Sequence, residues 1–283
     1  MQDGILSIQS AVAYGHVGNS AAVFPLQRLG FEVWPVNTVL FSNHTGYGAW
    51  RGRVVGLDWV EEIIEGMADR GAIKHTRAVL SGYLGDPGLG AAVLRVVERV
   101  RRARPDMVYA CDPVMGDEGR GFFVKAGIPE FFRDRAMAVA DIVTPNQFEL
   151  GWLAGGPVHD LADALDASAA LRVKGPKIVV CTSLTVEDAA ELGVLAQSAE
   201  GSWLCRTPRL PVTLSGTGDA FTALFLGAWL DTGRIEAALE HAAAAMFALV
   251  DATHGAGARE LELIAAQDQL VAPSRIFPAV RVG

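Results

Sequence analysis

The chain has 283 residues, of which 51% are hydrophobic, so it can bury a sizeable core in one or two domains. Its formal net charge of −8 argues against a general binder of nucleic acid or of anionic membranes. The three cysteines form no C-x-x-C pair and have no zinc-ligand spacing, which favours buried thiols in a reducing compartment.

The amino terminus, MQDGILSIQS, lacks the positive charge of a signal peptide. The longest apolar runs, residues 220–230 and 242–250, are too short to span a bilayer. We therefore expect a soluble cytoplasmic protein that contacts neither membranes nor nucleic acid.

Short apolar runs that end in small or polar residues alternate with longer helical patterns. Such alternation predicts an α/β fold with a mostly parallel sheet covered by helices on both faces. The predicted strands are 4–9, 32–41, 77–82, 107–112, 140–146 and 177–183, and the predicted helices are 19–29, 57–70, 88–104, 126–138 and 160–173.

The last third of the chain has a different order of elements. Residues 191–199 and 201–210 predict a hairpin that turns near Glu200-Gly201, and helices are expected at 216–231, 234–251 and 259–270. The sequence contains no internal repeat or linker, so we expect a single domain over residues 1–283.

Polar or small residues stand at the carboxyl end of each predicted strand. In open α/β sheets, ligands bind at that edge. Strand ends can also be polar simply because the loops that follow them are. This alternative explains the Ser and Gly residues well, but it explains Asp112 less well, because Asp112 follows the apolar run MVYAC. The residues are Ser10, Asn37 or Ser42, Gly82-Tyr83, Asp112, Thr144–Asn146 and Thr182-Ser183.

Two acidic segments follow the fourth and fifth predicted strands. Asp112 and Asp117 are separated by a proline and a glycine, in a strand end and mobile loop that would suit Mg²⁺ beside phosphate or would equally form an ordinary turn. Asn146 and Glu149 have the spacing of a helix capping box. A functional interpretation instead places Glu149 toward a phosphate and its metal.

The segment 212-VTLSGTGDAFTALF-225 places glycines and a carboxylate at the start of an apolar helix. Gly216 and Gly218 flank Thr217 and free backbone N–H groups for an anion, with the positive end of the helix dipole behind them. The segment is neither a P-loop nor a dinucleotide fingerprint. Asp219 has two possible roles. It stabilises the helix dipole, or, with a pKa near 4, it is an ionised base beside a transferring phosphoryl group.

Residues 37–53 are too rich in polar and aromatic side chains for ordinary core. His44, Thr45, Tyr47 and Trp50 predict a flap over an aromatic substrate, or else an exposed hairpin with aromatic packing.

Taken together, these segments resemble the pyridoxal kinases of the ribokinase-like superfamily. The matching blocks extend from end to end and are 7-SIQSAVAYGHVGNSAAVFPLQRLGFEVWPVNTVLFSNHTGYGAWRG-52, 81-SGYLGD-86, 111-CDPVMGD-117, 143-VTPNQFE-149 and 216-GTGDAF-221. The resemblance implies a ribokinase-like three-layer α/β/α fold with a small substrate-covering flap, usually in a homodimer. The implied activity is ATP-dependent phosphorylation of pyridoxal, and of pyridoxine and pyridoxamine, in vitamin B6 salvage.

The resemblance also implies a role for each matching residue. Asp219 would be the base that acts on the 5′-hydroxyl, with the backbone of Gly216, Thr217 and Gly218 as the anion hole. The implied substrate contacts are Ser10, at the pyridine nitrogen, with Val17, Phe41, His44, Thr45 and Tyr83 around the ring. The implied ATP contacts are Asp112, Thr144, Asn146, Glu149, Thr182, Ser183, Thr217 and Gly218. Asp117 and Glu149 would serve Mg²⁺, and Asp112, Thr144 and Thr182 would lie at a monovalent cation, K⁺ or Na⁺.

Three features depart from parts of this group. Thr182 stands where enterobacterial relatives carry a lysine, the loop 117–123 is short for a lid, and no cysteine stands near the anion hole. The absent cysteine disfavours a hydroxymethylpyrimidine kinase. Two further functions stay open, namely a sugar kinase and a protein that only binds pyridoxal phosphate. The aromatic flap argues against the first, and Asp219 argues against the second.

Overall fold

Ten strands form a single sheet in the computed structural model, which describes residues 2–283. The strands are β1 (Gly4–Val12), β2 (Glu32–Phe41), β3 (Gly52–Val54), β4 (Thr76–Ser81), β5 (Val108–Cys111), β8 (Ile142–Val143), β9 (Ile178–Leu184), β10 (Glu191–Ser198), β11 (Gly201–Pro208) and β12 (Val280–Val282). Their spatial order is β12-β11-β10-β9-β8-β5-β4-β1-β2-β3. The central strands from β2 to β9 run parallel, and the strands at both margins are antiparallel.

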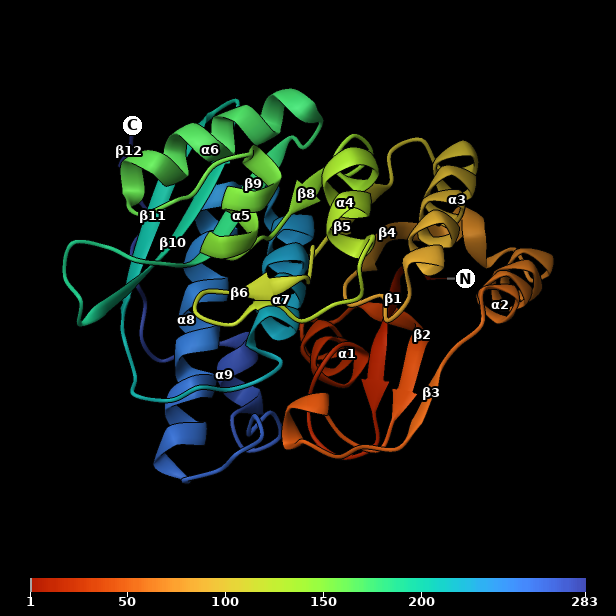
Figure 1. Cartoon of the computed structure of the whole chain (residues 1–283), viewed down its shortest axis with the longest axis horizontal. Helices are drawn as coiled ribbons and strands as arrows, with labels where there is room; N and C mark the ends of the chain where they lie inside the picture. The colour runs from red at the N-terminus through yellow and green to blue at the C-terminus, as the bar shows by residue number, and fades with distance from the viewer. Residues whose placement is uncertain (1) are drawn as a thin grey trace.

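Helices cover both faces of this sheet, which gives the three-layer α/β/α fold (Figure 1). One layer holds α2 (Leu57–Asp69), α3 (Pro87–Ala103), α4 (Ile128–Phe131), α5 (Gln147–Ala154) and α6 (Leu161–Lys174). The other holds α1 (Asn19–Arg28), α7 (Thr217–Thr232), α8 (Ile235–Gly255) and α9 (Gln267–Val271). Side chains alternate between the two cores along β1, since Leu6 and Ile8 belong to one and Ile5 to the other. No helix of residues 2–283 is long and apolar enough to cross a membrane.

The predicted helix over 259–270 is wrong for most of its length, because only Gln267–Val271 is helical. Leu261 and Leu263 are both buried although they are two residues apart, a spacing that one helix face cannot provide. The backbone N–H of Glu262 donates to the hydroxyl of Thr253 at 3.0 Å, and this bond fixes the segment as an irregular turn.

The predicted helix over 126–138 forms as two pieces. After α4, residues Phe132–Ala136 make a π-helical turn. Buried pairs recur after five residues here, with Phe131 and Phe132 followed by Ala136 and Met137, and a wider turn places both pairs in the core.

Two small features were not predicted. Strands β6 (Gly116–Asp117) and β7 (Gly121–Phe122) form a short hairpin where a mobile loop was expected, and β12 adds a strand to the edge of the sheet. The β10–β11 hairpin is confirmed, although its turn is at Ala199-Glu200, one residue earlier than expected.

A buried amide at the start of α1 organises the end of β1. The pairing of β1 with β2 shifts between Gln9 and Ser10. Asn19 donates to the side-chain oxygen of Asn37 at 2.8 Å and accepts from the hydroxyl of Ser7 at 2.7 Å. Since all of these groups lie away from water or nearly so, the bonds fix the irregularity that precedes Ser10.

All three cysteines are free and buried, as expected. Burial raises the pKa of Cys111 and of Cys205 to about 12, and it also raises the pKa of Cys181. The thiols therefore remain protonated at neutral pH.

Truncation within the core should separate buried from exposed apolar side chains. Phe225 of α7 is fully buried, whereas Val173 of α6 is 90% exposed. Phe225→Ala should lower the free energy of unfolding by about 3–5 kcal/mol, and Val173→Ala should change it by less than about 0.5 kcal/mol. Urea unfolding of both variants, followed by circular dichroism, gives the comparison; equal losses would contradict the assigned core.

Candidate active site

The carboxyl ends of the parallel strands meet the start of α7. Ser10, Asp112 and Thr144 are all buried at this edge. The hydroxyl of Thr144 lies 2.8 Å from that of Thr222 in α7, and a Cβ on Gly218 would lie 3.6 Å from a carboxylate oxygen of Asp112. The expected gathering of polar groups at one edge of the sheet is therefore confirmed.

The turn at Gly216, Thr217 and Gly218 forms the start of α7. Gly216 has a φ of +84°, and a Cβ there would lie 1.9 Å from the carbonyl oxygen of His16. Only glycine fits, because the β1–α1 loop lies directly against this turn. The N–H groups of the first helical turn have no partner within the helix, so they can bind an anion.

Asp219 lies in the first turn of α7, where the backbone N–H of Gly18 favours the ionised carboxylate and so acts to lower its pKa. Burial raises the pKa of Asp219 to about 6, which corrects the expected value near 4. The carboxylate is still mostly ionised at neutral pH, as a general base requires.

Asp112 lies near two other carboxylates beside this turn, those of Glu149 and Asp219. Asp112 and Glu149 are buried. Burial, together with the charges of Glu149 and Asp219, raises the pKa of Asp112 well above its usual range. Burial also raises the pKa of Glu149 to about 7, although hydrogen bonds from backbone N–H groups act to lower it. A cation beside these groups would relieve the repulsion of Asp112 by its two neighbours.

Glu149 forms the predicted capping box with Asn146. Its carboxylate accepts from the N–H of Asn146 at 2.9 Å, and the side chain of Asn146 accepts from the N–H of Glu149 at 2.9 Å. The other oxygen of Glu149 accepts from the N–H of Met115 at 2.8 Å. Glu149 therefore connects the start of α5 to the segment that carries Asp117.

Asp117 is exposed on the β6–β7 hairpin. Phe122 anchors this hairpin on α5, with ring centroids 5.2 Å from Phe148 and 5.1 Å from Trp152. Arg120, at the tip, is close enough to the flap for its charge to act on His44. The tip of the hairpin therefore lies near the flap.

The flap is the connection between β2 and β3, as the sequence indicated. His44 lies 3.3 Å from the hydroxyl of Ser215, just before the glycine turn. Burial and, to a lesser degree, the charge of Arg120 lower the pKa of His44, which favours the neutral ring. Thr45 is exposed, and Trp50 packs on Phe41 with ring centroids 3.9 Å apart. The segment is therefore a hairpin with aromatic packing, and its histidine lies beside Ser215 before the glycine turn. Its role as a flap over a substrate stays a prediction.

Val17 and Tyr83 flank the same region. Val17 is buried in the β1–α1 loop, and the carbonyl of Tyr83 accepts from the hydroxyl of Thr38 at 2.9 Å. Burial raises the pKa of the Tyr83 phenol.

Thr182 and Ser183 lie at a bulge of β9, where two residues stand opposite Val194 of β10. Ser183 has a φ of +55°, the one left-handed non-glycine residue among residues 2–283. Thr182 pairs with Asn146, so the two predicted nucleotide contacts are neighbours. Such strain is concentrated at functional sites, because the surrounding structure must hold it in place.

Three groups at the site were missed by the sequence analysis. The N–H of Gly18 acts on the carboxylate of Asp219, His16 contacts Gly216, and Glu260 accepts from the N–H of His16 at 2.9 Å. The glycines around His16 in 15-GHVGN-19 gave a signal of close backbone approach. No local pattern could have placed Glu260 beside a loop more than two hundred residues earlier.

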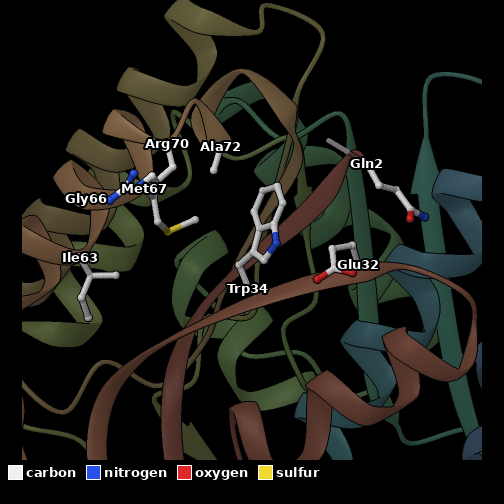
Figure 2. A pocket seen from close by; sticks show the side chains of 8 residues that line it. All are labelled: Gln2, Glu32, Trp34, Ile63, Gly66, Met67, Arg70 and Ala72. Carbon is white, nitrogen blue, oxygen red and sulfur yellow. The ribbon is translucent and has the colours of Figure 1, made fainter.

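A separate cavity of about 520 Å³ lies at the opposite end of the strands. Trp34 and Met67 line it, with Arg70 nearby, as Figure 2 shows. Because Trp34 stands near the amino end of β2, this cavity is remote from the carboxyl edge and is no part of the candidate site.

Comparisons with known proteins agree with this geometry. The family described as phosphomethylpyrimidine kinase matches residues 43–261. Pyridoxal kinase PdxY of Rubrobacter xylanophilus is 56% identical over 99% of this chain and 97% of its own length, and that of Deinococcus radiodurans is 54% identical over 98% and 96%.

A solved structure extends the likeness to the whole fold. The structure of pyridoxal kinase from Leishmania donovani in complex with ADP and pyridoxine superposes with a TM-score of 0.93 and 33% identity, over 99% of both chains. On these grounds the chain belongs to the pyridoxal kinase family, within the ribokinase-like fold.

Proposed function

We propose that this enzyme transfers the γ-phosphoryl group of ATP to the 5′-hydroxyl of pyridoxal, and of pyridoxine and pyridoxamine. The observation that carries the proposal is the placement of Asp219 beside the Gly216–Gly218 turn, at the start of α7 and against the carboxyl edge of the sheet. A base next to an anion-binding turn is what phosphoryl transfer to an alcohol needs. The homodimer and the cytoplasmic location remain predictions.

Asp219 would accept the proton of the 5′-hydroxyl as its oxygen bonds to the γ-phosphorus. The bond from that phosphorus to the bridging oxygen then breaks, and ADP leaves. The backbone N–H groups at Thr217 and Gly218 would stabilise the charge on the transferring group, because they are fixed before the reaction begins. The product is pyridoxal 5′-phosphate, consistent with vitamin B6 salvage.

The pyridine ring would lie between the end of β1 and the flap. Ser10 would bond to the ring nitrogen, and Val17, Phe41, His44, Thr45 and Tyr83 would enclose the ring. The burial of Ser10 and Val17 and the contact of His44 with Ser215 support this position.

The nucleotide would lie along Thr144, Asn146, Thr182 and Ser183, toward Thr217 and Gly218. Mg²⁺ neutralises phosphate charge in such reactions. Asp117 and Glu149 would hold it or its waters, and Asp112, Thr144 and Thr182 would hold K⁺ or Na⁺. Within residues 2–283 no three His, Cys, Asp or Glu side chains form a metal site by themselves. Mg²⁺ bound to one or two carboxylates together with phosphate oxygens needs no such cluster.

A hydroxymethylpyrimidine is the second candidate substrate, because the phosphomethylpyrimidine kinase family matches residues 43–261. An ADP-release assay with MgATP should compare pyridoxal, pyridoxine, pyridoxamine, hydroxymethylpyrimidine and ribose, with and without K⁺. We expect turnover of pyridoxal and little turnover of ribose. Faster turnover of hydroxymethylpyrimidine than of every B6 vitamer would replace the proposed substrate class.

Replacing the base should separate catalysis from folding. Asp219→Asn should lower kcat by about 10²–10⁴-fold, since the carboxamide cannot accept the hydroxyl proton. Its thermal midpoint should equal or exceed that of the wild type, because the raised pKa shows that ionised Asp219 costs folding stability at neutral pH. Wild-type turnover by a folded Asp219→Asn protein would remove the assigned role.

The ring contact can be tested by a smaller change at Ser10. Ser10→Ala should raise KM for pyridoxal by roughly tenfold, about the effect of one lost hydrogen bond, and should leave KM for ATP nearly unchanged. Steady-state kinetics with each substrate varied in turn will show the split. Equal increases in both KM values would move Ser10 out of the substrate pocket.

A further inference from the structure

The irregular segment after α8 connects two loops that border the active site. The carboxylate of Glu260 accepts from the phenol of Tyr47, in the flap, and from the backbone N–H of His16, in the β1–α1 loop. Each bond uses a different carboxylate oxygen. Glu260 therefore joins two loops that have no sequence proximity to it.

The surroundings are shaped for this carboxylate. A Cβ on Gly15 would lie 2.3 Å from one of its oxygens, and Gly15 has a φ of +92°, so a glycine allows the close approach. The guanidinium of Arg259 lies 3.9 Å from the ring centroid of Tyr47, and Tyr14 packs edge-on against the same ring. The hydrogen bond to Glu260 raises the pKa of Tyr47 to about 12, so the phenol remains a donor.

Both loops continue directly into the catalytic machinery. In the β1–α1 loop, the carbonyl of His16 abuts Gly216, and the N–H of Gly18 acts on the carboxylate of Asp219 to lower its pKa. In the flap, His44 precedes Tyr47 by three residues and lies 3.3 Å from the hydroxyl of Ser215. A shift at Glu260 would therefore reach the substrate side of the site through both loops.

We propose that Glu260 is a positioning residue that holds the flap and the β1–α1 loop in the arrangement that binds the phosphoryl acceptor. It acts through Tyr47 and His16 and touches neither substrate. The kinetic part of this inference rests on the proposed function, whereas the structural part does not.

The sharpest variant is Glu260→Gln. A carboxylate accepts both hydrogen bonds as an ionised group. A carboxamide can accept from the N–H of His16 only if its NH₂ group donates to the phenol oxygen of Tyr47, so the bond to Tyr47 is reversed and neither bond keeps its charge. Because bonds to ionised groups are about twice as strong as neutral ones, we expect kcat/KM for pyridoxal to fall about tenfold or more. KM for ATP should change by less than about twofold, since most of the proposed nucleotide contacts lie outside the two loops that Glu260 joins, at Thr144, Asn146, Thr182 and Ser183.

Two further variants establish the coupling. Tyr47→Phe removes the phenol and keeps the ring. The double variant Glu260→Gln/Tyr47→Phe should lose little more activity than the more damaging of the two single variants, because both changes act on the same bond. Glu262→Gln is the matched control, since the carboxylate of Glu262 makes no hydrogen bond among residues 2–283.

Hydrogen exchange without any substrate supplies the independent measurement. In Glu260→Gln, amides of residues 13–18 and 43–51 should exchange about tenfold faster than in the wild type, while the Glu262→Gln protein should match the wild type. The inference would be overturned if both segments of Glu260→Gln exchanged at the wild-type rate. It would also be overturned if Glu260→Gln and Glu262→Gln accelerated exchange equally. If the wild type does not turn over pyridoxal, the proposed function fails, and the exchange result still decides the role of Glu260.

Discussion

The close approach of the β1–α1 loop to the start of α7 connects the two halves of the site, since His16 abuts Gly216 and the backbone N–H of Gly18 acts on the carboxylate of Asp219. It joins the end of β1, where Ser10 lies, to the start of α7, where the anion-binding turn lies. A Cβ on Gly18 would be 2.1 Å from the carbonyl oxygen of Ser10, so only glycine lets the loop lie this close to the end of β1. The packing of this loop therefore limits how far the ring site and the base can move apart.

Charge imposes the second constraint on the site. Glu149 and Asp219 both repel Asp112 in surroundings that water reaches poorly, and all three carboxyl groups have a raised pKa. The protein keeps these carboxylates at a cost in folding stability, because burial penalises their ionised forms. Cations that accompany a nucleotide would lower that cost, so occupation of the site and stability of the fold should be linked.

The sequence predicted the sheet, the polar strand ends, the glycine turn and the capping box, because each depends on residues close together in the chain. It failed where distant contacts decide the local structure. The burial of Leu261 and Leu263 overrode the helical pattern over 259–270, and the pKa of Asp219 reflects burial by elements from the whole chain. The left-handed Ser183 likewise depends on pairing with β10, which no window around 178-IVVCTSL-184 contains.

The burial of Cys111, Cys181 and Cys205 has a practical consequence. Alkylating reagents attack the thiolate, and these side chains are both inaccessible and protonated. A cysteine introduced at an exposed flap position such as Ala49, where a side chain is already accommodated, would then be the one thiol that reacts. A fluorophore or spin label could therefore be attached to the flap of the otherwise native chain, and the opening of the flap could be followed directly in solution.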